Sequence, residues 1–412
     1  MVTNGSKTDC SIQYPSDWGF MPLGKCCVDK LSYGINAPAI PYASCFPSYL
    51  RITDINDDGT YNDNDKKSVM TTDQERYSLR SGDIVLARTG SSTGKSYLYD
   101  SHDGEFVYAG FLIRASIDEE RHNAKYIVSQ LRVPRYWAWV AASSMRSGQP
   151  GINGKQYSSF LIPIPSKKEQ DAIAETLSCF DHHIANLTKL IEKKKAIRDG
   201  ALEDLVSGRT RLDGFSGDWK EKGLLECVEL IQGLTYSPEN VKSYGTLVLR
   251  SSNIQNNRLE LNDNVYVDIV VSKTKMIQNG DILICVRNGS SALIGKSCTL
   301  KEMPHTTFGA FMSVLRGDKT GFVSKVFESH YVQRQVRDRT NATINQITKK
   351  DFEQIRILLP SIPEQKAIEK MLTSMDKEIA SLEEEKDKMM QIKAGAMDDL
   401  LTGRVRLSRQ GG

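Results

Sequence analysis

The sequence predicts an α+β protein: two mixed α/β globular regions separated by two long antiparallel helices that form an intramolecular coiled coil. Two observations support this fold class. A run with helical periodicity occurs twice, at residues 166–208 and 361–403, and the copies align without a gap at an offset of 195 residues. Shorter motifs recur between these runs, which indicates a duplicated unit with approximate internal two-fold symmetry.

Length and composition limit the class of protein without naming a function. A chain of 412 residues has room for two or three domains, each with its own core. No segment approaches about 18 consecutive apolar residues, and the first residues lack an apolar signal core, so we expect a cytoplasmic protein without membrane spans. The net charge of +3 neither requires nor excludes nucleic acid, because binding depends on where basic residues gather.

The first globular region is expected at residues 1–160 and contains strand-like and helix-like runs. Tyr126–Val140 is typical of a helix in part, with Pro134 near a boundary or in a first turn. Ser143–Ser159 is polar and rich in glycine and amides, so we expect a loop there. The strand-like runs are Leu79–Ala87, Phe106–Ile113 and Phe160–Ile164.

Each copy of the long run begins and ends with a helix signal. Ser166 with Glu169 fits a capping box, in which the hydroxyl accepts a backbone amide while the glutamate reaches back, and Ser361 with Glu364 repeats it. Glycine is a common helix terminator because it adopts the left-handed conformation easily. The terminating glycines are Gly208 and Gly403.

Apolar residues in both copies recur in alternating steps of four and three, which is the a/d pattern of a coiled coil. Each helix would measure about 60 Å at 1.5 Å per residue. A long helix with one apolar stripe needs a partner, so we expect the two copies to pair; alternatively, each helix binds a different protein. The seam residues are Ile173, Leu177, Phe180, Ile184 and Leu187 in the first copy, and Ile368, Leu372, Met375, Ile379 and Leu382 in the second.

The second globular region, expected at residues 213–355, repeats motifs of the first, while the helical segments are expected at 161–212 and 356–412. The offsets of these motifs vary, whereas the helix offset is constant, so the globular regions have drifted in loop length. The repeated motifs are Asp17–Trp18 and Asp218–Trp219, Leu50–Arg51 and Leu249–Arg250, Gly82–Asp83 and Gly280–Asp281, Gly94–Lys95 and Gly295–Lys296, and Ile152–Asn153 and Ile344–Asn345.

No motif indicates catalysis. Gly90–Ser96 and Gly289–Ser297 resemble a phosphate-binding loop, but three and five residues separate the first glycine from the Gly-Lys pair, where that motif needs four. They fit better as tight loops between strands, each with a basic residue near its tip. His182 and His183 lack companions at metal-ligand spacing, and the eight cysteines form no ligand pattern. We expect a non-catalytic chain without a metal.

Polar and basic residues gather in loops of both globular regions, and this pattern favours DNA binding. Arginine reads guanine edges, asparagine and glutamine read adenine, and lysine or threonine hold phosphates. Each residue alone is more simply a solvated side chain, so the hypothesis depends on their clustering in both copies. The candidates are Tyr33, Arg51, Arg88, Thr89, Lys95, Arg146, Gln149, Asn153 and Lys155 in the first region, and Tyr236, Arg250, Arg287, Asn288, Lys296, Arg337, Arg339, Asn341 and Gln346 in the second.

These features together resemble the specificity (S) subunit of type I restriction-modification systems over nearly the whole chain. The most specific motifs are the helix starts, P-x-x-x-E-Q-x-A-I at Pro165–Ile173 and Pro360–Ile368, and the helix ends, L-x-x-G-R-x-R-L at Leu205–Leu212 and Leu400–Leu407. The resemblance implies that the globular regions are target recognition domains, each reading one half of a bipartite, asymmetric site in double-stranded DNA.

The resemblance also implies a set of partners. The helices would set the gap between the half-sites and dock two modification (M) subunits, with the seam residues serving as spacer and docking surface. The M subunits would bring S-adenosylmethionine and methylate adenine, so this chain would hold no cofactor, and restriction (R) subunits would join for cleavage. The alternative is a non-catalytic coiled-coil scaffold whose globular regions bind other proteins.

Overall fold

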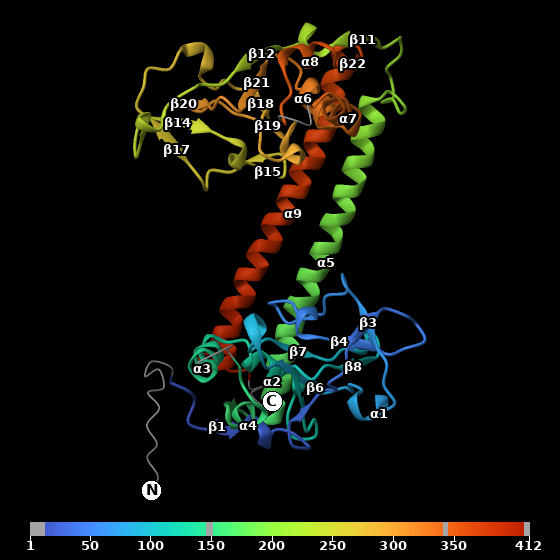
Figure 1. The fold of residues 1–412 in the computed structure, drawn as a ribbon, viewed down its shortest axis with the longest axis vertical. Helices are drawn as coiled ribbons and strands as arrows, with labels where there is room; N and C mark the ends of the chain where they lie inside the picture. Colours follow the sequence, from blue (N-terminus) through green and yellow to red (C-terminus); the bar gives the residue numbers. More distant parts are fainter. Residues whose placement is uncertain (1–12, 146–150, 341–344, 408–412) are drawn as a thin grey trace, which may run out of the picture. The chain divides into compact units, whose positions relative to one another are not determined.

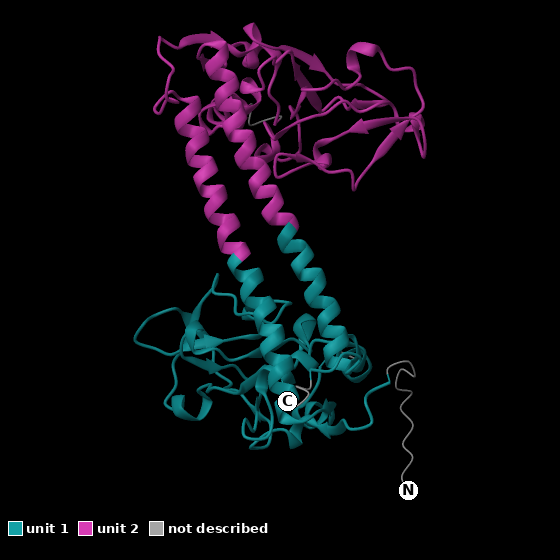
Figure 2. Ribbon diagram, turned by 180° about the vertical axis from the view of Figure 1, so that it is seen from behind, with its two compact units in different colours: residues 1–186, 385–412 teal, residues 187–384 magenta. Residues whose placement is uncertain are grey.

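The computed structural model forms two compact units (Figure 2). Unit 1 joins residues 1–186 to residues 385–412, and unit 2 comprises residues 187–384. Each unit therefore contains parts of both long helices, which Figure 1 labels α5 and α9. Helix α5 spans Lys167–Val206, and α9 spans Ile362–Thr402. The structure describes residues 13–145, 151–340 and 345–407.

The globular part of unit 1 is built from short strands and helices. The strands are β1 (Gly19–Pro22), β2 (Ser32–Tyr33), β3 (Ala39–Pro41), β4 (Ser48–Leu50), β5 (Lys67–Val69), β6 (Asp83–Ala87), β7 (Ser96–Leu98), β8 (Phe106–Tyr108), β9 (Leu112–Ser116) and β10 (Leu161–Ile164). The helices are α1 (Gln74–Tyr77), α2 (Ala124–Gln130), α3 (Pro134–Ser144) and α4 (Gly154–Ser159). They form sheets of order β2-β9-β6-β7 and β3-β5-β4-β8 and the pair β1-β10.

Unit 2 repeats the topology of these sheets and adds one two-stranded pair. Its strands are β11 (Lys220–Gly223), β12 (Glu229–Gln232), β13 (Val241–Lys242), β14 (Thr246–Leu249), β15 (Ile254–Gln255), β16 (Arg258–Leu259), β17 (Val265–Val267), β18 (Ile282–Cys285), β19 (Ser297–Thr299), β20 (Thr306–Phe308), β21 (Met312–Arg316) and β22 (Arg356–Leu359). Its helices are α6 (Phe322–Glu328), α7 (His330–Arg339) and α8 (Lys349–Glu353). The sheets have the orders β12-β21-β18-β19 and β13-β17-β14-β20, with the pairs β11-β22 and β15-β16.

The repeated topology confirms the α+β duplication, and the structure changes some element boundaries. Strand β6 begins only at Asp83, because a turn places the Asp83 amide 3.0 Å from the Arg80 carbonyl oxygen. The run Phe106–Ile113 is two strands, β8 and β9, which belong to different sheets. Pro134 lies in the first turn of α3, as expected. The segment expected to be a loop, Ser143–Ser159, contains helix α4.

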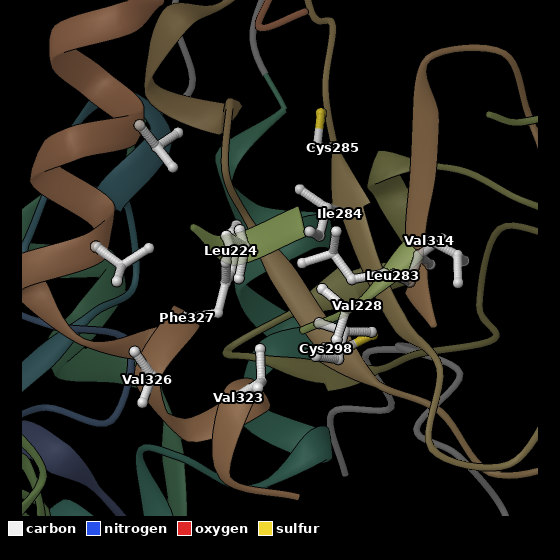
Figure 3. Close-up of a cluster of buried hydrophobic side chains, with 14 of the residues drawn as sticks. Leu224, Val228, Leu283, Ile284, Cys285, Cys298, Val314, Val323, Val326 and Phe327 are labelled. Carbon is white, nitrogen blue, oxygen red and sulfur yellow. The ribbon is translucent and has the colours of Figure 1, made fainter. Parts of the chain in front are cut away.

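The core of unit 2 lies between the sheet β12-β21-β18-β19, the short helices and the ends of the long helices. Figure 3 shows Leu283 from β18, Val314 from β21 and Phe327 from α6 within one buried cluster. Ile368 and Leu372 of α9 join the same cluster and are fully buried. Unit 1 is built in the same way, since its core includes residues from the start of α5 and the end of α9. The long helices are therefore part of both globular cores.

The two helices pair within each unit, which confirms the expected intramolecular pairing. Ile173, Leu177, Leu187, Ile368, Leu372 and Ile379 are buried, and Phe180, Ile184, Met375 and Leu382 are half-buried. Ion pairs join the helices beside this seam. In unit 1, Lys393 Nζ lies 2.5 Å from Asp181 Oδ1. In unit 2, Arg198 Nε lies 2.8 Å from Asp376 Oδ1.

Burial alone would raise the pKa of Asp376 in unit 2. Hydrogen bonds and positive charge from Lys325 and Arg198 outweigh burial and hold this pKa below its usual value. Lys325 belongs to α6, so the same carboxylate ties the helix pair to the globular part of the unit. The helix pair is thus fixed both by apolar packing and by charge.

An arginine–glutamate pair joins the start of one long helix to the end of the other in each unit. In unit 1, the Arg406 guanidinium donates to both oxygens of Glu169, at 2.6 and 2.8 Å. In unit 2, Arg211 donates to both oxygens of Glu364, at 2.9 and 2.7 Å. Both glutamates are buried. This explains why the helix-start and helix-end motifs are repeated together.

In unit 1, the Asp17–Trp18 motif and the glycine at the end of α9 lie around this pair. The Trp18 ring lies 5.7 Å from the Arg406 guanidinium, and Asp17 accepts from Arg406 at 2.9 and 2.8 Å. A Cβ atom on Gly403 would lie 2.6 Å from Pro15 and 3.2 Å from Trp18, and this glycine has a φ of +71°. Glycine is therefore required there for both space and conformation.

The expected capping boxes are wrong in one respect. The Glu169 amide does donate to Ser166 Oγ, at 3.3 Å. The carboxylates of Glu169 and Glu364, however, bind the arginines and do not reach back to the serine amides. The arginine comes from a distant part of the chain and offers a charge, so it outcompetes a local backbone amide.

No helix in the described ranges is long and apolar enough to cross a membrane.

We expect Arg406→Ala to lower the free energy of unfolding of unit 1 by about 1–3 kcal/mol, because it leaves the buried Glu169 carboxylate unpaired. Urea unfolding followed by tryptophan fluorescence measures this, since Trp18 lies against Arg406. Arg404→Ala is the matched control: Arg404 pairs with the exposed Asp398 and Asp399, and its loss should cost less than about 1 kcal/mol. Equal effects of the two substitutions would contradict the proposed importance of the buried pair.

Candidate nucleic-acid interface

Three loops meet at the end of strand β6 in unit 1. The Arg88 amide donates to the Phe111 carbonyl oxygen at 3.0 Å, and the Ile152 amide donates to the Arg88 carbonyl oxygen at 2.9 Å. Thr89 forms an isolated bridge with Gly151. We call this surface, with Tyr33, the loop edge of unit 1.

The side chains of Tyr33 and Arg88 contact each other at the loop edge. The Arg88 guanidinium carbon lies 4.8 Å from the centre of the Tyr33 ring, which is a cation–π contact. The Tyr33 hydroxyl accepts from the Gly154 amide at 2.9 Å. The next residue, Gly34, must be glycine, because a Cβ atom would lie 2.2 Å from the Tyr108 carbonyl oxygen. This close approach fixes the position of Tyr33.

The same three loops meet in unit 2. The Val286 amide donates to the Phe311 carbonyl oxygen at 3.0 Å, and the Ile347 amide donates to the Val286 carbonyl oxygen at 3.0 Å. Arg287 forms a bridge with Gln346, and its guanidinium carbon lies 5.2 Å from the Phe311 ring centre. These residues form the loop edge of unit 2.

The two edges are matched by backbone register. Leu86 pairs with Ile113, and Ile284 pairs with Ser313, so Leu86 matches Ile284. Thr89, and not Arg88, therefore occupies the position of Arg287. The matched positions are Tyr33 and Gln232, Arg88 and Val286, Thr89 and Arg287, Phe111 and Phe311, and Gly151 and Gln346.

One of the sequence alignments, that of Ile152–Asn153 with Ile344–Asn345, is wrong. Asn153 accepts from the Gln156 amide at 2.9 Å and caps α4, and Thr348 caps α8 in the same way. Ile152–Asn153 therefore matches Ile347–Thr348. The offset of 195 residues between these pairs equals the helix offset, so the drift in loop length lies before this point. Ile344 itself lies outside the described residues.

Several predicted candidates lie at or near the loop edges. Asn288 belongs to the unit 2 edge, where its amide donates to the Asn345 carbonyl oxygen at 3.2 Å and its side chain donates to Ser251 Oγ at 3.0 Å. Tyr236 lies close to the turn before Phe311, since a Cβ atom on Gly309 would lie 3.9 Å from its ring. Lys155 is exposed on α4. Their contact with DNA stays a prediction.

The lysines of the glycine loops lie at the base of each loop and not at its tip. The Ala87 amide donates to the Lys95 carbonyl oxygen at 2.9 Å, and the Cys285 amide donates to that of Lys296 at the same distance. Lys95 Nζ lies 2.7 Å from Asp57 Oδ1. The expected tight loops between strands are confirmed, because β6 and β18 pair antiparallel with β7 and β19.

The arginines of the Leu-Arg motifs are bound within their own units. Arg51 Nη2 lies 2.6 Å from Asp54 Oδ1, and Arg250 Nη2 lies 2.6 Å from Asp263 Oδ2. Each arginine amide also donates to the side chain three residues later, at 2.8 Å to Asp54 and 2.9 Å to Asn253. These contacts hold a turn and account for the repeat of the motif.

Two of the remaining candidates lie on α7. Arg337 is exposed, whereas Arg339 is half-buried and donates to the Gln335 and Gln354 carbonyl oxygens at 3.1 and 3.3 Å. Arg146, Gln149 and Asn341 lie outside the described residues.

Sequence reasoning missed Phe111 and Phe311. Both lie at the loop edges, and both rings are more than half exposed. The signal that could have found them is the recurrence of an aromatic residue, two small residues and phenylalanine, as Tyr108–Phe111 and Phe308–Phe311. An exposed aromatic ring can stack on bases.

The described residues contain no group of three or more histidine, cysteine, aspartate or glutamate side chains that could hold a metal ion. What the loop edges offer is hydrogen-bonding and aromatic side chains on a rigid backbone. Side chains of these kinds can contact base edges and phosphates.

The repeated fold and its two different loop edges define a class of protein that contacts an extended ligand through two related modules. The family model described as the type I restriction modification DNA specificity domain matches residues 41–196 and 216–391. These ranges cover most of the chain, and the chain belongs to this family. It is a DNA sequence-specificity subunit, as the sequence predicted.

Individual relatives agree with this membership. A Methanocaldococcus jannaschii protein named as the type I restriction enzyme MjaX specificity subunit is 27% identical over 369 residues, which cover 83% of this chain and 82% of the relative. The StySPI specificity subunit of Salmonella potsdam is 30% identical over 185 residues, which cover 42% of this chain and 39% of the relative. The solved S subunit from M. genitalium has a TM-score of 0.59 at 19% identity, covering 96% of this chain and 98% of that structure, and so shares the fold.

We expect Asn153→Ala to lower the free energy of unfolding by about 1 kcal/mol, because it removes the cap of α4. Asn153→Ser should keep most of the stability, since a serine hydroxyl can accept the same amide. Lys155→Ala, on the exposed face of the same helix, is the matched control and should change stability by less than about 0.5 kcal/mol. Denaturant unfolding compares the three variants. A stable Asn153→Ala variant would show that the cap is unimportant.

Proposed function

We propose that each unit reads one half of a bipartite DNA site, and that this chain selects the sequence for a type I restriction-modification complex. The observation that carries the proposal is the pair of loop edges, which share their backbone hydrogen bonds but differ at most side-chain positions. Identical backbones can approach DNA in the same way, while different side chains select different bases. The two half-sites should therefore differ in sequence.

The paired helices are proposed to act as spacer and as docking surface for two M subunits. Their apolar seam, their ion pairs and their contribution to both cores support this role. Leu190, Ile197 and Ile392 leave large apolar side chains exposed on the helices and could contact a partner.

Catalysis is proposed to belong to the partners. The M subunits would bind S-adenosylmethionine and methylate adenine, R subunits would cleave, and this chain would carry no cofactor. The loop edges contain no candidate nucleophile–base pair, and the described residues offer no metal cluster. The complex would work in the cytoplasm, where the DNA lies.

Methylation-site mapping tests the half-site assignment. We expect DNA treated with the reconstituted M–S complex to be methylated at one bipartite sequence. Arg287→Ala should relax base preference in one half-site and spare the other, because unit 1 has Thr89 at this position. A relaxed position would typically reflect a loss of about 1–3 kcal/mol of discrimination.

Arg356→Ala is the matched control for this substitution, because Arg356 is an exposed arginine of unit 2 on strand β22. It should leave both half-sites unchanged. If Arg287→Ala weakened binding to all sequences equally, the side chain would contact phosphates. Absence of any salt-dependent DNA binding, with or without M subunits, would favour the interaction scaffold.

Shortening both helices together tests the spacer role. Removing residues 183–189 and 384–390 deletes one heptad from each helix and keeps the a/d positions of the two helices in register. Each helix loses about 10 Å, so the gap between half-sites should shrink by about three base pairs. Methylation mapping measures the gap.

Deleting residues 183–189 alone is the control, and it should misalign Arg198 with Asp376 and destabilise the helix pair. An unchanged gap in a folded double deletion would refute the spacer role.

A further inference from the structure

An exposed phenylalanine stands at the same place in both units. Phe111 lies in the turn between β8 and β9, and Phe311 lies in the turn between β20 and β21. Their exposed fractions are 57% and 56%. Burial of an aromatic ring is favourable, so two matched rings left in solvent call for a partner.

The backbone holds both rings in the same way. The Leu112 amide donates to the Ala109 carbonyl oxygen at 2.8 Å, and the Met312 amide donates to that of Gly309 at 2.8 Å. The phenylalanine carbonyl oxygen accepts from the amide at the end of the neighbouring strand, at 3.0 Å in each unit. The turn is therefore a fixed support and not a flexible tip.

Two other exposed apolar residues of unit 1, Phe20 and Leu161, have no apolar counterpart in unit 2. Phe20 is 50% exposed, and the register of β1 and β11 places Glu221 at its position in unit 2. Leu161 is 47% exposed, and Arg356 takes its position. Unit 2 has charged side chains at these two positions, whereas the exposed phenylalanine is present in both units.

The neighbours of the ring differ between the units. Thr89 is replaced by Arg287, and Gly151 by Gln346. A protein partner common to both units would require a matching surface around the ring, and these neighbours do not provide one. Duplex DNA fits better as the partner. Stacked bases present an apolar surface whatever the sequence, which suits a constant ring, while base edges differ with sequence, which suits neighbours that differ between the units.

We propose that Phe111 and Phe311 each press an apolar ring against the stacked bases of their own half-site. Each ring would act as a sequence-independent wedge, next to the side chains that differ between the units and select the bases. Apolar wedges of this kind partly unstack one base step and allow the protein to contact more of the duplex. The proposal rests on the proposed function, since it assumes that each unit lies on DNA.

The test uses the complete M–S complex and a duplex that carries the site found by methylation mapping. Phe111→Ala and Phe311→Ala should each weaken binding by about tenfold to a hundredfold. The methylated sequence should stay the same. 2-Aminopurine placed at successive positions should become more fluorescent at one step in each half-site with the unaltered complex. Each substitution should abolish that signal in one half only.

Phe20→Ala is the matched control, because it removes an equally exposed phenylalanine from unit 1 without a counterpart in unit 2. It should leave affinity and fluorescence unchanged. Phe111→Leu should keep most of the affinity, because an apolar wedge need not be aromatic. Circular dichroism confirms that each variant is folded.

Three results would overturn the wedge. Folded Phe111→Ala and Phe311→Ala complexes could bind and fluoresce like the unaltered one. They could methylate relaxed sequences, which would make the rings base readers. A photoreactive p-benzoylphenylalanine placed at position 111 could cross-link to an M subunit and not to DNA. Failure of the proposed function is distinct, because the unaltered complex would then methylate no bipartite sequence.

Discussion

A glutamate at the start of each long helix is buried, and it depends on an arginine from the end of the other long helix. A buried carboxylate is very costly unless a charge and hydrogen bonds compensate it. Arg406 compensates Glu169, and Arg211 compensates Glu364. Each unit can therefore fold with its buried carboxylate paired only when both long helices are present. The same requirement explains why the last residues of the chain belong with the first ones.

The arrangement separates a constant frame from variable loops. The frame consists of the helix pair, the arginine–glutamate pairs and the tryptophans of the Asp-Trp motifs, and it is repeated almost residue for residue. At the loop edges the backbone hydrogen bonds are retained, but the side chains differ. Tyr33 of unit 1 corresponds to Gln232 of unit 2, and Thr89 corresponds to Arg287. Side chains can differ there within the same fold, because the backbone hydrogen bonds that join the loops are retained in both units.

Much of the candidate site could be located from sequence, but not the role of each residue in it. The repeats placed Arg88, Arg287 and Gln346 in the correct loops. They could not show that Asn153 caps a helix, or that Lys95 is held by Asp57, because those partners depend on local geometry. The strand register then showed that Thr89 of unit 1 lies at the position of Arg287 in unit 2.

The sequence by itself determined the architecture: two globular regions, two long helices and their pairing. It could do so because helical periodicity and a long gapless repeat are properties of the chain that do not depend on context. Only the tertiary structure decided which residues are structural and which face outward. Glu169 was read as a local cap and is the partner of Arg406, and Phe111 looked like part of a strand and is an exposed ring. Both outcomes arise from contacts between segments far apart in the chain, and such contacts leave no periodic signal in the sequence.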